Sequence, residues 1–306
     1  MNCPDYNSPQ ALKRILDEKG FAMQKKFGQN FLTSPDAREK IVALLELTPG
    51  NTVWEVGPGL GAMTSSLLRG GAKVTAFELD RGFISLLTGY FADECTDGSF
   101  RLVPGDVLKN WKRELDASGD EADCNAGKIR LFGNLPYNIA ATFIADTITE
   151  GARFERCVFT VQREVADRMR AKPGSKDNSS FSILCQWLYD VKACVDLAPG
   201  CFWPRPNVAS QAVLFTPRKN PVELKDRKSF VTLVHALFSQ RRKTLLNNIK
   251  PLLPPGTSAE ELFSRAGVSK GERAENLSVE EFAALADTLF SFRSQCAIIG
   301  QQSNKQ

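Results

Sequence analysis

The sequence predicts an α/β fold followed by a smaller helical domain. Short apolar segments alternate with helical segments from about residue 52, and beyond about residue 218 the pattern is helical only. Glycine, acidic or amide residues follow four of the apolar segments. Strands that alternate with helices are typical of a mostly parallel sheet with helices on both faces. A length of 306 residues allows one large domain or two of ordinary size.

The first residues predict a short helical appendage, which we place at residues 1–24. Pro9 is a suitable first helical residue, and Gly20 is a suitable stop. After it, Ser34-Pro35-Asp36 predicts the start of a second helix that runs to about Leu47.

A domain over residues 25–217 contains the predicted sheet. Strands are expected at 52–56, 73–77, 100–103, 129–132, 157–161 and 208–215, with helices at 62–69 and after Asp80. Residues 110–128 are acidic and lack a clear period, which predicts a surface insertion.

The last domain, residues 218–306, is predicted to be all-helical. The stretch 216–221 has two prolines and two basic residues and reads as a linker. Helices are expected over 226–238, 241–249, 259–266 and 279–290, and Ser278 with Glu281 forms a capping box for the last one.

Composition excludes several classes of protein. No apolar run is long enough to cross a bilayer, and the N-terminus lacks the layout of a signal peptide, so we expect a cytoplasmic protein. A net charge of +4 permits a nucleic-acid partner without requiring one. The eight cysteines form no CxxC pair and His235 is the single histidine, so no metal site is expected. We expect His235 to be packed within an apolar helix rather than catalytic, because no Asp or Ser partner is near it in sequence.

Four successive strand ends carry groups that suit a nucleoside cofactor. Gly57 and Gly59 lie in a glycine turn between a strand and a helix, where the backbone can approach a ligand closely. Glu78 and Asp106 end the next two strands, and Asn134 ends the fourth. Ligands of open α/β sheets bind at this edge. S-adenosylmethionine suits all four positions, with its ribose at Glu78, its adenine amine at Asp106 and its methionine end at the glycine turn.

The tetrad Asn134-Leu135-Pro136-Tyr137 suits methylation of an exocyclic amine. Such an amine is a poor nucleophile because its lone pair is shared with the ring. The Asn134 side chain and the Leu135 carbonyl could accept its two N–H groups, and Tyr137 could stack on the base. Alone, the tetrad is better explained by an ordinary turn between a strand and a helix. A nicotinamide oxidoreductase is an alternative for the glycine turn, but no hydride-handling Tyr-x-x-x-Lys pair is present.

From about Lys25 to Phe290, the chain resembles the small-subunit rRNA adenine N6,N6-dimethyltransferase family, which is related to the erythromycin-resistance rRNA methyltransferases. The resemblance rests on seven ordered motifs: 28–32 (GQNFL), 55–61 (EVGPGLG), 105–108 (GDVL), 134–139 (NLPYNI), 162–166 (QREVA), 202–206 (FWPRP) and 241–244 (RRKT).

This resemblance implies a seven-stranded, Rossmann-like class I methyltransferase sheet with a small helical domain. It implies transfer of two methyl groups to each of two adjacent adenosines near the 3′ end of small-subunit rRNA. We expect the substrate to be rRNA in an assembling subunit and the enzyme to be a monomer. The residues that would line the S-adenosylmethionine site are Asn30, Leu32, Gly57, Glu78, Asp106 and Asn134.

Two positions depart from the family pattern. Residues 176–181 (KDNSSF) replace a Lys-Asp-Tyr-Gly-Arg-like run, which puts in doubt any role for an arginine in that loop. Ala209 stands where an Asp is usual, and we expect it to alter only a local cap or turn.

In the expected mechanism, adenine N6 attacks the methyl group in line, while Asn134 and the Leu135 carbonyl hold the amine. Tyr137 stacks on one face of the base. Phe202 is a candidate for the opposite face, and an ordinary core aromatic is an equal alternative. We interpret Glu55 as a buried carboxylate that organises the glycine turn rather than as a proton shuttle.

RNA affinity is expected to come from basic residues that contact phosphates. Residues 161–176 hold five basic and two acidic side chains, including Arg163 and Arg168, and a second cluster is Arg241-Arg242-Lys243. Solvated helix faces are the alternative interpretation of both clusters. A protein that only docks on the small subunit, with vestigial methylation, is the alternative function, and a cofactor titration would distinguish it.

Overall fold

The computed structural model describes residues 3–20, 30–117, 128–135 and 137–303, apart from the side chains of Tyr137, Asn138 and residues 297–303. Within these ranges the chain forms two compact units. The first comprises Met1–Ala166 with Asp190–Pro217, and the second comprises Asp167–Tyr189 with Arg218–Gln306.

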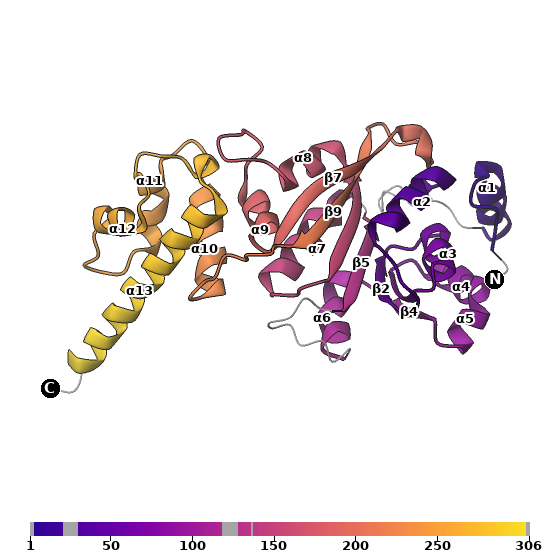
Figure 1. Ribbon diagram of the computed structural model, residues 1–306, viewed down its shortest axis with the longest axis horizontal. Helices are drawn as coiled ribbons and strands as arrows, with labels where there is room; N and C mark the ends of the chain where they lie inside the picture. Colours follow the sequence, from indigo (N-terminus) through magenta and orange to yellow (C-terminus); the bar gives the residue numbers. More distant parts are fainter. Residues whose placement is uncertain (1–2, 21–29, 118–127, 136, 304–306) are drawn as a thin grey trace. The chain divides into compact units, whose positions relative to one another are not determined.

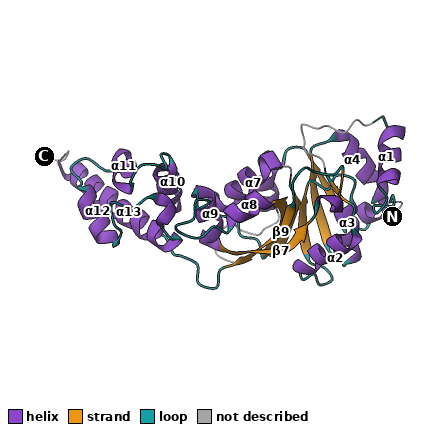
Figure 2. Cartoon of the chain, turned by 90° about the horizontal axis from the view of Figure 1, so that it is seen from above, coloured by secondary structure: helices purple, strands orange, loops and turns teal. Residues whose placement is uncertain are grey.

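The first unit is built on a mostly parallel sheet, as predicted. Among the described residues, seven strands lie in the order β4-β3-β2-β5-β6-β9-β7. The neighbouring pairs from β4 to β6 are parallel, and β9 runs antiparallel to β6. Helices lie on both sides of these strands (Figure 2). The strands are β2 (Thr52–Val56), β3 (Lys73–Glu78), β4 (Phe100–Pro104), β5 (Ile129–Asn134), β6 (Arg156–Gln162), β7 (Tyr189–Leu197) and β9 (Ser210–Pro217).

The order of the strands places a ligand-binding edge at the centre of the sheet. The chain proceeds from β2 to β3 and β4 in one direction, and then returns to β5 on the other side of β2 (Figure 1). Such a reversal leaves a crevice at the carboxyl ends of the two central strands. The groups that follow β2 and β5 are therefore the first candidates for ligand contact.

Buried apolar side chains explain why the strands form. Trp54 on β2 is 2% exposed, and its ring centroid lies 5.0 Å from that of Phe77 on β3. Phe159 and Phe215 meet edge to face across β6 and β9, with centroids 5.3 Å apart. Strands buried on both faces read as continuous apolar runs, which is why strands such as β2, β3 and β6 could be predicted from the sequence.

The helices of the first unit connect these strands. They are α2 (Pro35–Leu44), α3 (Ala62–Arg69), α4 (Arg81–Tyr90), α5 (Ala92–Thr96), α6 (Val107–Ala117), α7 (Tyr137–Thr149) and α8 (Arg163–Met169), of which the last continues into the second unit. The side chains of Ser34 and Asp80 accept hydrogen bonds from the first turns of α2 and α4, respectively.

The prediction that residues 110–128 form a surface insertion is wrong for its first part. Residues 110–117 belong to α6, where Trp111 and Leu115 are 2% and 4% exposed. Trp111 also donates from its ring nitrogen to Asp146 on α7, at 2.9 Å. The acidic composition hid the helix because only a narrow face of it is apolar. Residues 118–127 lie outside the described residues.

The N-terminal helix is packed onto the first unit rather than appended to it. Helix α1 (Pro9–Glu18) begins after Ser8, whose side chain accepts from Ala11 N–H. Leu12 and Leu16 are 1% and 4% exposed, and they share an apolar cluster with residues of the sheet unit that include Phe31 and Phe83. Residues 1–2 and 21–24 of the predicted appendage lie outside the described ranges.

A two-stranded sheet joins two distant parts of the first unit. Strand β1 (Phe31–Leu32) pairs antiparallel with β8 (Phe202–Trp203), so that Leu32 lies opposite Phe202. Phe31 stacks on Trp203 with ring centroids 6.1 Å apart. The short helix η2 (Pro199–Cys201) leads into β8, and the peptide bond between Trp203 and Pro204 is cis.

The second unit is helical, as predicted. Its helices are α9 (Ser180–Leu188), α10 (Arg227–Phe238), α11 (Leu245–Ile249), α12 (Ala259–Ala266) and α13 (Val279–Ser303), with short turns η3 (Lys250–Leu252) and η4 (Ala274–Asn276). Ser278 and Glu281 form the predicted capping box at the start of α13. In the described part of the chain, no helix is long and apolar enough to span a membrane.

The contact pattern places one segment differently from the predicted domain boundary. Residues 167–189 were expected to belong to the 25–217 domain, whereas they group with the helical unit. The reason is that α9 packs against α10 and α13, and Trp187 lies 4.9 Å from Phe230 between ring centroids. Helix α9 and strand β7 were not predicted from the sequence at all.

Candidate functional site

One pocket of the first unit lies at the carboxyl ends of the central strands. All seven residues predicted to bind the cofactor line it: Asn30, Leu32, Gly57, Gly59, Glu78, Asp106 and Asn134. Leu135 and Phe202, two of the residues predicted to contact the target base, line it as well. The pocket therefore brings together the strand ends that were predicted to meet at the carboxyl edge of the sheet.

The glycine turn after β2 has the backbone that the sequence predicted. Gly57, Gly59 and Gly61 have φ values of 72°, 58° and 90°, which L side chains rarely adopt. A Cβ atom at Gly61 would lie 2.7 Å from the Phe91 ring. The turn is thus specified by both conformation and space, and it leads directly into α3.

Glu78 is held at the end of β3 by backbone donors. Its Oε1 accepts from Leu79 N–H and Asp80 N–H, both at 2.9 Å, and its Oε2 accepts from Gly59 N–H at 3.1 Å. A carboxylate oxygen accepts about two hydrogen bonds, so Oε2 has capacity for a further donor. Burial raises the pKa of Glu78 to about 7, although these N–H groups oppose the shift.

Asp106 both caps a helix and lines the pocket. Its Oδ1 accepts from Leu108 N–H at 3.0 Å, and its carbonyl accepts from Asn110 N–H at 3.1 Å, so it caps α6. The residue also lines the pocket. One side chain therefore fixes the start of α6 and places a carboxylate at the end of β4.

Glu55 organises the glycine turn, as the sequence predicted. It is 1% exposed, and its Oε2 accepts from the Thr64 hydroxyl at 2.6 Å. Because Thr64 lies in the first turn of α3, this bond connects β2 to the helix beyond the glycines. Burial, with a smaller contribution from the negative charge of Glu78, raises the pKa of Glu55 to about 8, although the bond from Thr64 opposes the shift.

Asn134 is held at both ends of its side-chain amide. Its Nδ2 donates to the Asn30 carbonyl at 2.9 Å, and its Oδ1 accepts from the Thr160 hydroxyl at 2.5 Å. Leu135, which follows it, is 3% exposed. A Cβ atom at Gly133 would lie 2.9 Å from the Leu135 side chain, so a glycine is needed before the tetrad. Thr160 is a pocket residue that the sequence reasoning missed.

The predicted stacking residues differ in what the structure describes. The Tyr137 side chain lies outside the described residues, and so does Pro136. Phe202 is 6% exposed, belongs to the apolar core and also lines the pocket. From the sequence, Phe202 is either an ordinary core aromatic or a residue that stacks on the target base. In the structure its side chain belongs to the apolar core and also lines the pocket.

The segment before α2 is fixed by a buried arginine. Arg38, which is 6% exposed, donates from Nη1 to the Leu32 carbonyl at 2.8 Å and from Nη2 to Asn7 Oδ1. Thr33 N–H donates to the Cys201 carbonyl at 2.8 Å. These bonds hold Leu32, and the β1–β8 pairing holds it against Phe202. No local pattern predicts this role for Arg38, because one of its partners, Asn7, is 31 residues away along the chain.

The first basic cluster is partly neutralised within the molecule. Arg163 is exposed at the start of α8. Arg168 is half-buried, with its guanidinium carbon 5.9 Å from the Phe181 ring centroid. Arg170 forms an ion pair with Asp167. Of these three arginines, Arg163 is the most available for contact with a phosphate.

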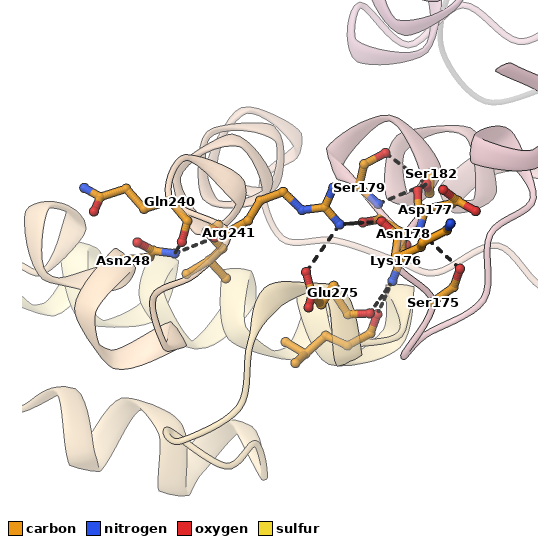
Figure 3. A network of polar contacts seen from close by, with 12 residues as sticks. Ser175, Lys176, Asp177, Asn178, Ser179, Ser182, Gln240, Arg241, Asn248 and Glu275 are labelled. Atoms are coloured by element: carbon orange, nitrogen blue, oxygen red, sulfur yellow. Dashed lines mark hydrogen bonds and ion pairs between the residues drawn. The ribbon is translucent and has the colours of Figure 1, made fainter. Parts of the chain in front are cut away.

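The second basic cluster lies in a turn of the helical unit. Helix α11 begins at Leu245, so the prediction of a helix from Arg241 is wrong for residues 241–244. Arg242 and Lys243 are exposed in this turn. Lys243 N–H donates to the Gln240 carbonyl, and Asn248 Nδ2 donates to the Leu237 carbonyl. Asn248 Nδ2 also donates to the Gln240 carbonyl (Figure 3), so the turn is closed by hydrogen bonds.

Arg241 points into the helical unit (Figure 3). Its Nη2 donates to the Lys176 carbonyl at 2.6 Å and to the Asn178 carbonyl at 3.1 Å, and it pairs with Glu275 at 3.3 Å. Asn178 is fully buried and donates to the Glu275 carbonyl. Arg241 therefore connects the loop that departs from the family pattern to η4, although 47% of its side chain is exposed.

His235 is exposed on α10, so the prediction that it is packed is wrong. The neighbours Leu233, Val234 and Leu237 take the buried face of this helix. In the described ranges, no group of three or more His, Cys, Asp and Glu side chains could hold a metal ion.

A family model for ribosomal RNA adenine dimethylases matches residues 20–290 of this chain. The chain belongs to the ribosomal RNA adenine dimethylase family. It is 45% identical to ribosomal RNA small subunit methyltransferase A of Treponema denticola, over 94% of this chain and 96% of that protein. It is 38% identical to the protein of the same name from Borreliella burgdorferi, again over 94% and 96% of the two chains.

Two solved structures support the fold of this dimethylase. A dimethyladenosine transferase from Plasmodium falciparum has a TM-score of 0.66 and 21% identity, over 82% of this chain and 94% of that one. The 23S rRNA methyltransferase ErmE has a TM-score of 0.59 and 20% identity, over 85% and 99%. The predicted Rossmann-like methyltransferase fold and the predicted family are therefore confirmed.

Proposed function

We propose that this enzyme transfers methyl groups from S-adenosylmethionine to adenine N6 in small-subunit rRNA. Two methyl groups would go to each of two adjacent adenosines near the 3′ end, during assembly of the subunit. The observation that carries this proposal is the single pocket that unites the glycine turn, Glu78 and Asp106 with the Asn134 amide. The names of the relatives from Treponema and Borreliella support small-subunit rRNA as the substrate class.

The residues of the pocket fit the cofactor. The positive-φ glycines permit close approach by its methionine end, and the Gly59 N–H and Glu78 lie together where a ribose would be held. Asp106 would accept from the adenine amine, and Asn30 and Leu32 would complete the site. When bound, the cofactor supplies an electrophilic methyl group, so the protein has to supply position.

The Asn134 side chain and the Leu135 carbonyl would orient the target amine. Each accepts a hydrogen bond from one N–H, which favours a tetrahedral nitrogen whose lone pair is available for bonding. Tyr137 would stack on one face of the extruded base and Phe202 on the other. No strong general base is needed, because the amine loses its proton after alkylation. Glu55 is unsuited to that role, since it is buried and bonded to Thr64.

RNA binding would combine both units. We propose phosphate contacts from Arg163, Arg168, Arg242 and Lys243. Arg241, which was predicted to contact RNA, would instead support the turn that presents the latter two. We assign methyl transfer to the 25–217 region, which also supplies Arg163 and Arg168, and further rRNA contacts to the helical 218–306 region. The enzyme would act in the cytoplasm, as a monomer, on rRNA in an assembling subunit.

The test is an Asn134→Ala variant, assayed with unmethylated small ribosomal subunits and isotope-labelled S-adenosylmethionine. Turnover should fall by a factor of about 100 or more, because positioning is the main catalytic contribution of the protein. Binding to the subunit should remain within about twofold of wild type. Asn247→Ala, at an exposed asparagine of the helical unit, is the matched control and should keep full activity. Normal turnover by Asn134→Ala would refute the proposed role.

The alternative is a factor that only docks on the small subunit. Calorimetric titration with S-adenosylmethionine distinguishes the two functions, because a docking factor need not bind the cofactor. A wild-type protein that binds small subunits but neither binds the cofactor nor labels rRNA would establish the alternative.

A further inference from the structure

The orientation of the Asn134 amide is determined by its two neighbours. The Asn30 carbonyl, 2.9 Å from Nδ2, can only accept a hydrogen bond, so the NH₂ end of the amide must face it. The amide oxygen then faces Thr160, whose hydroxyl can donate. Reversing the amide would place two acceptors together at Asn30. The pair of contacts therefore selects one orientation of Asn134.

The position of Thr160 follows from the register of the sheet. In the parallel ladder between β5 and β6, Thr160 lies directly opposite Asn134. Both residues line the pocket. The two side chains are 26 residues apart in sequence, and the backbone pairing brings them together.

The hydroxyl of Thr160 is unusual for its surroundings. Thr160 is 3% exposed and lies on β6, where the side chains from Cys157 to Val161 are buried on both faces of the sheet. A valine has the same shape and would pack equally well on an apolar strand. A buried hydroxyl is unfavourable unless it is hydrogen-bonded, and the bond it makes is to Asn134 Oδ1.

We propose that Thr160 is a positioning residue for methyl transfer, acting through Asn134. Its hydroxyl occupies one of the two acceptor sites of Oδ1 and so directs the other toward the target amine. Without this bond the amide is fixed only at Nδ2 and can rotate about its last side-chain torsion, which is intrinsically broad. The inference rests on the proposed role of Asn134 in holding the amine.

The second methyl transfer should depend on Thr160 more than the first. Each transfer exchanges one amine proton for one methyl group: the proton goes to water, and the electron pair of the broken carbon–sulfur bond stays on sulfur. After the first transfer a single N–H remains to be held by Asn134 or by the Leu135 carbonyl. A misplaced acceptor is then not compensated by a second hydrogen bond, so monomethylated adenosine should accumulate.

The test compares Thr160→Val, which removes the hydroxyl at nearly constant shape, with Thr160→Ser, which keeps it. With unmethylated small subunits, kcat of Thr160→Val should fall by about 3- to 10-fold, the effect of one neutral hydrogen bond. KM for the subunit should stay within about twofold, because Thr160 is not proposed to bind RNA. Mass spectrometry of the digested rRNA should show a larger fraction of monomethyladenosine. Thr160→Ser should restore both kcat and the product ratio.

Two measurements independent of turnover separate positioning from a structural role. The dissociation constant for S-adenosylmethionine and the melting temperature of Thr160→Val should match those of wild type. If both change together with kcat and Thr160→Ser does not rescue, the positioning role is refuted. If Thr160→Val does not fold, Thr160→Cys carries the same test, because a thiol is a weak donor of similar size.

The Asn134→Ala variant tests the proposed function independently of the role of Thr160. Wild-type kcat and product ratio in Thr160→Val, together with an inactive Asn134→Ala, would overturn the role of Thr160 alone. Normal turnover by Asn134→Ala would instead overturn the proposed function of the amide, on which the role of Thr160 depends.

Discussion

Cofactor affinity should depend on pH through Glu78. The pKa of this carboxyl is raised to about 7 by burial, so the group changes charge within the physiological range. Hydroxyl groups of a ribose donate hydrogen bonds, and the ionised carboxylate is the better acceptor for them. Protonation therefore competes with cofactor binding, and affinity should fall as pH falls through about 7.

The size of the effect follows from that pKa. With a pKa of about 7, the ionised fraction of Glu78 drops from roughly nine tenths at pH 8 to roughly one tenth at pH 6. If only the carboxylate form binds, the dissociation constant of S-adenosylmethionine should rise by about tenfold over this range, or ~1.4 kcal/mol.

The assay is isothermal titration calorimetry at pH 6, 7 and 8. Titration in buffers of different ionisation enthalpy also measures the proton released by Glu78 on binding. Glu78→Gln is the control, because a single amide oxygen cannot replace two carboxylate oxygens and does not titrate. It should bind the cofactor weakly at every pH. Any pH dependence that it retains belongs to other groups, including the α-amino group of the cofactor.

The reasoning would be refuted by equal affinity of the wild-type protein at pH 6 and pH 8. It would also be refuted by a Glu78→Gln variant with the same pH profile as wild type, since the titrating group would then lie elsewhere. A melting temperature of Glu78→Gln close to that of wild type is required for either comparison.

Two further predictions concern stability. Arg241→Ala should destabilise the helical unit by about 1–2 kcal/mol, because the variant loses a half-exposed guanidinium that donates to two carbonyls. Arg242→Ala, at an exposed position, should change the free energy of unfolding by less than about 0.5 kcal/mol. Chemical denaturation measures both free energies of unfolding. For RNA binding the order of the two variants is reversed: Arg242→Ala should weaken binding and reduce its salt dependence in a filter assay. The pKa of Glu55 is raised in the folded state to about 8, so its contribution to stability is present below the unfolded pKa near 4.5 and is lost as pH rises through about 8. Glu55→Gln, which can still accept from Thr64, should therefore unfold at a higher temperature than wild type at pH 9 but not at pH 4, and equal midpoints at pH 9 would contradict this.

The correct sequence predictions depended on local signals. The glycine turn has alternating glycines because its φ values are positive, and that requirement is visible in the residue types. Glu78, Asp106 and Asn134 follow apolar strands, and parallel strands bring their carboxyl ends to one edge. The incorrect predictions involved segments whose burial is set by distant partners. Residues 110–117 of α6 have the acidic composition of a surface insertion, but Trp111 in this segment is buried and bonds to Asp146 on α7.

The sequence by itself determined the sheet, the helical end, the family and the strand ends that form the pocket, because each leaves a pattern within a few neighbouring residues. Only the tertiary structure decided that Thr160 faces Asn134 and that Arg241 turns inward to Lys176 and Asn178. These contacts join residues 26 and 65 positions apart, among others. Strand register and helix packing determine which of these distant residues meet, and neither can be predicted from the residues next to each position in the sequence.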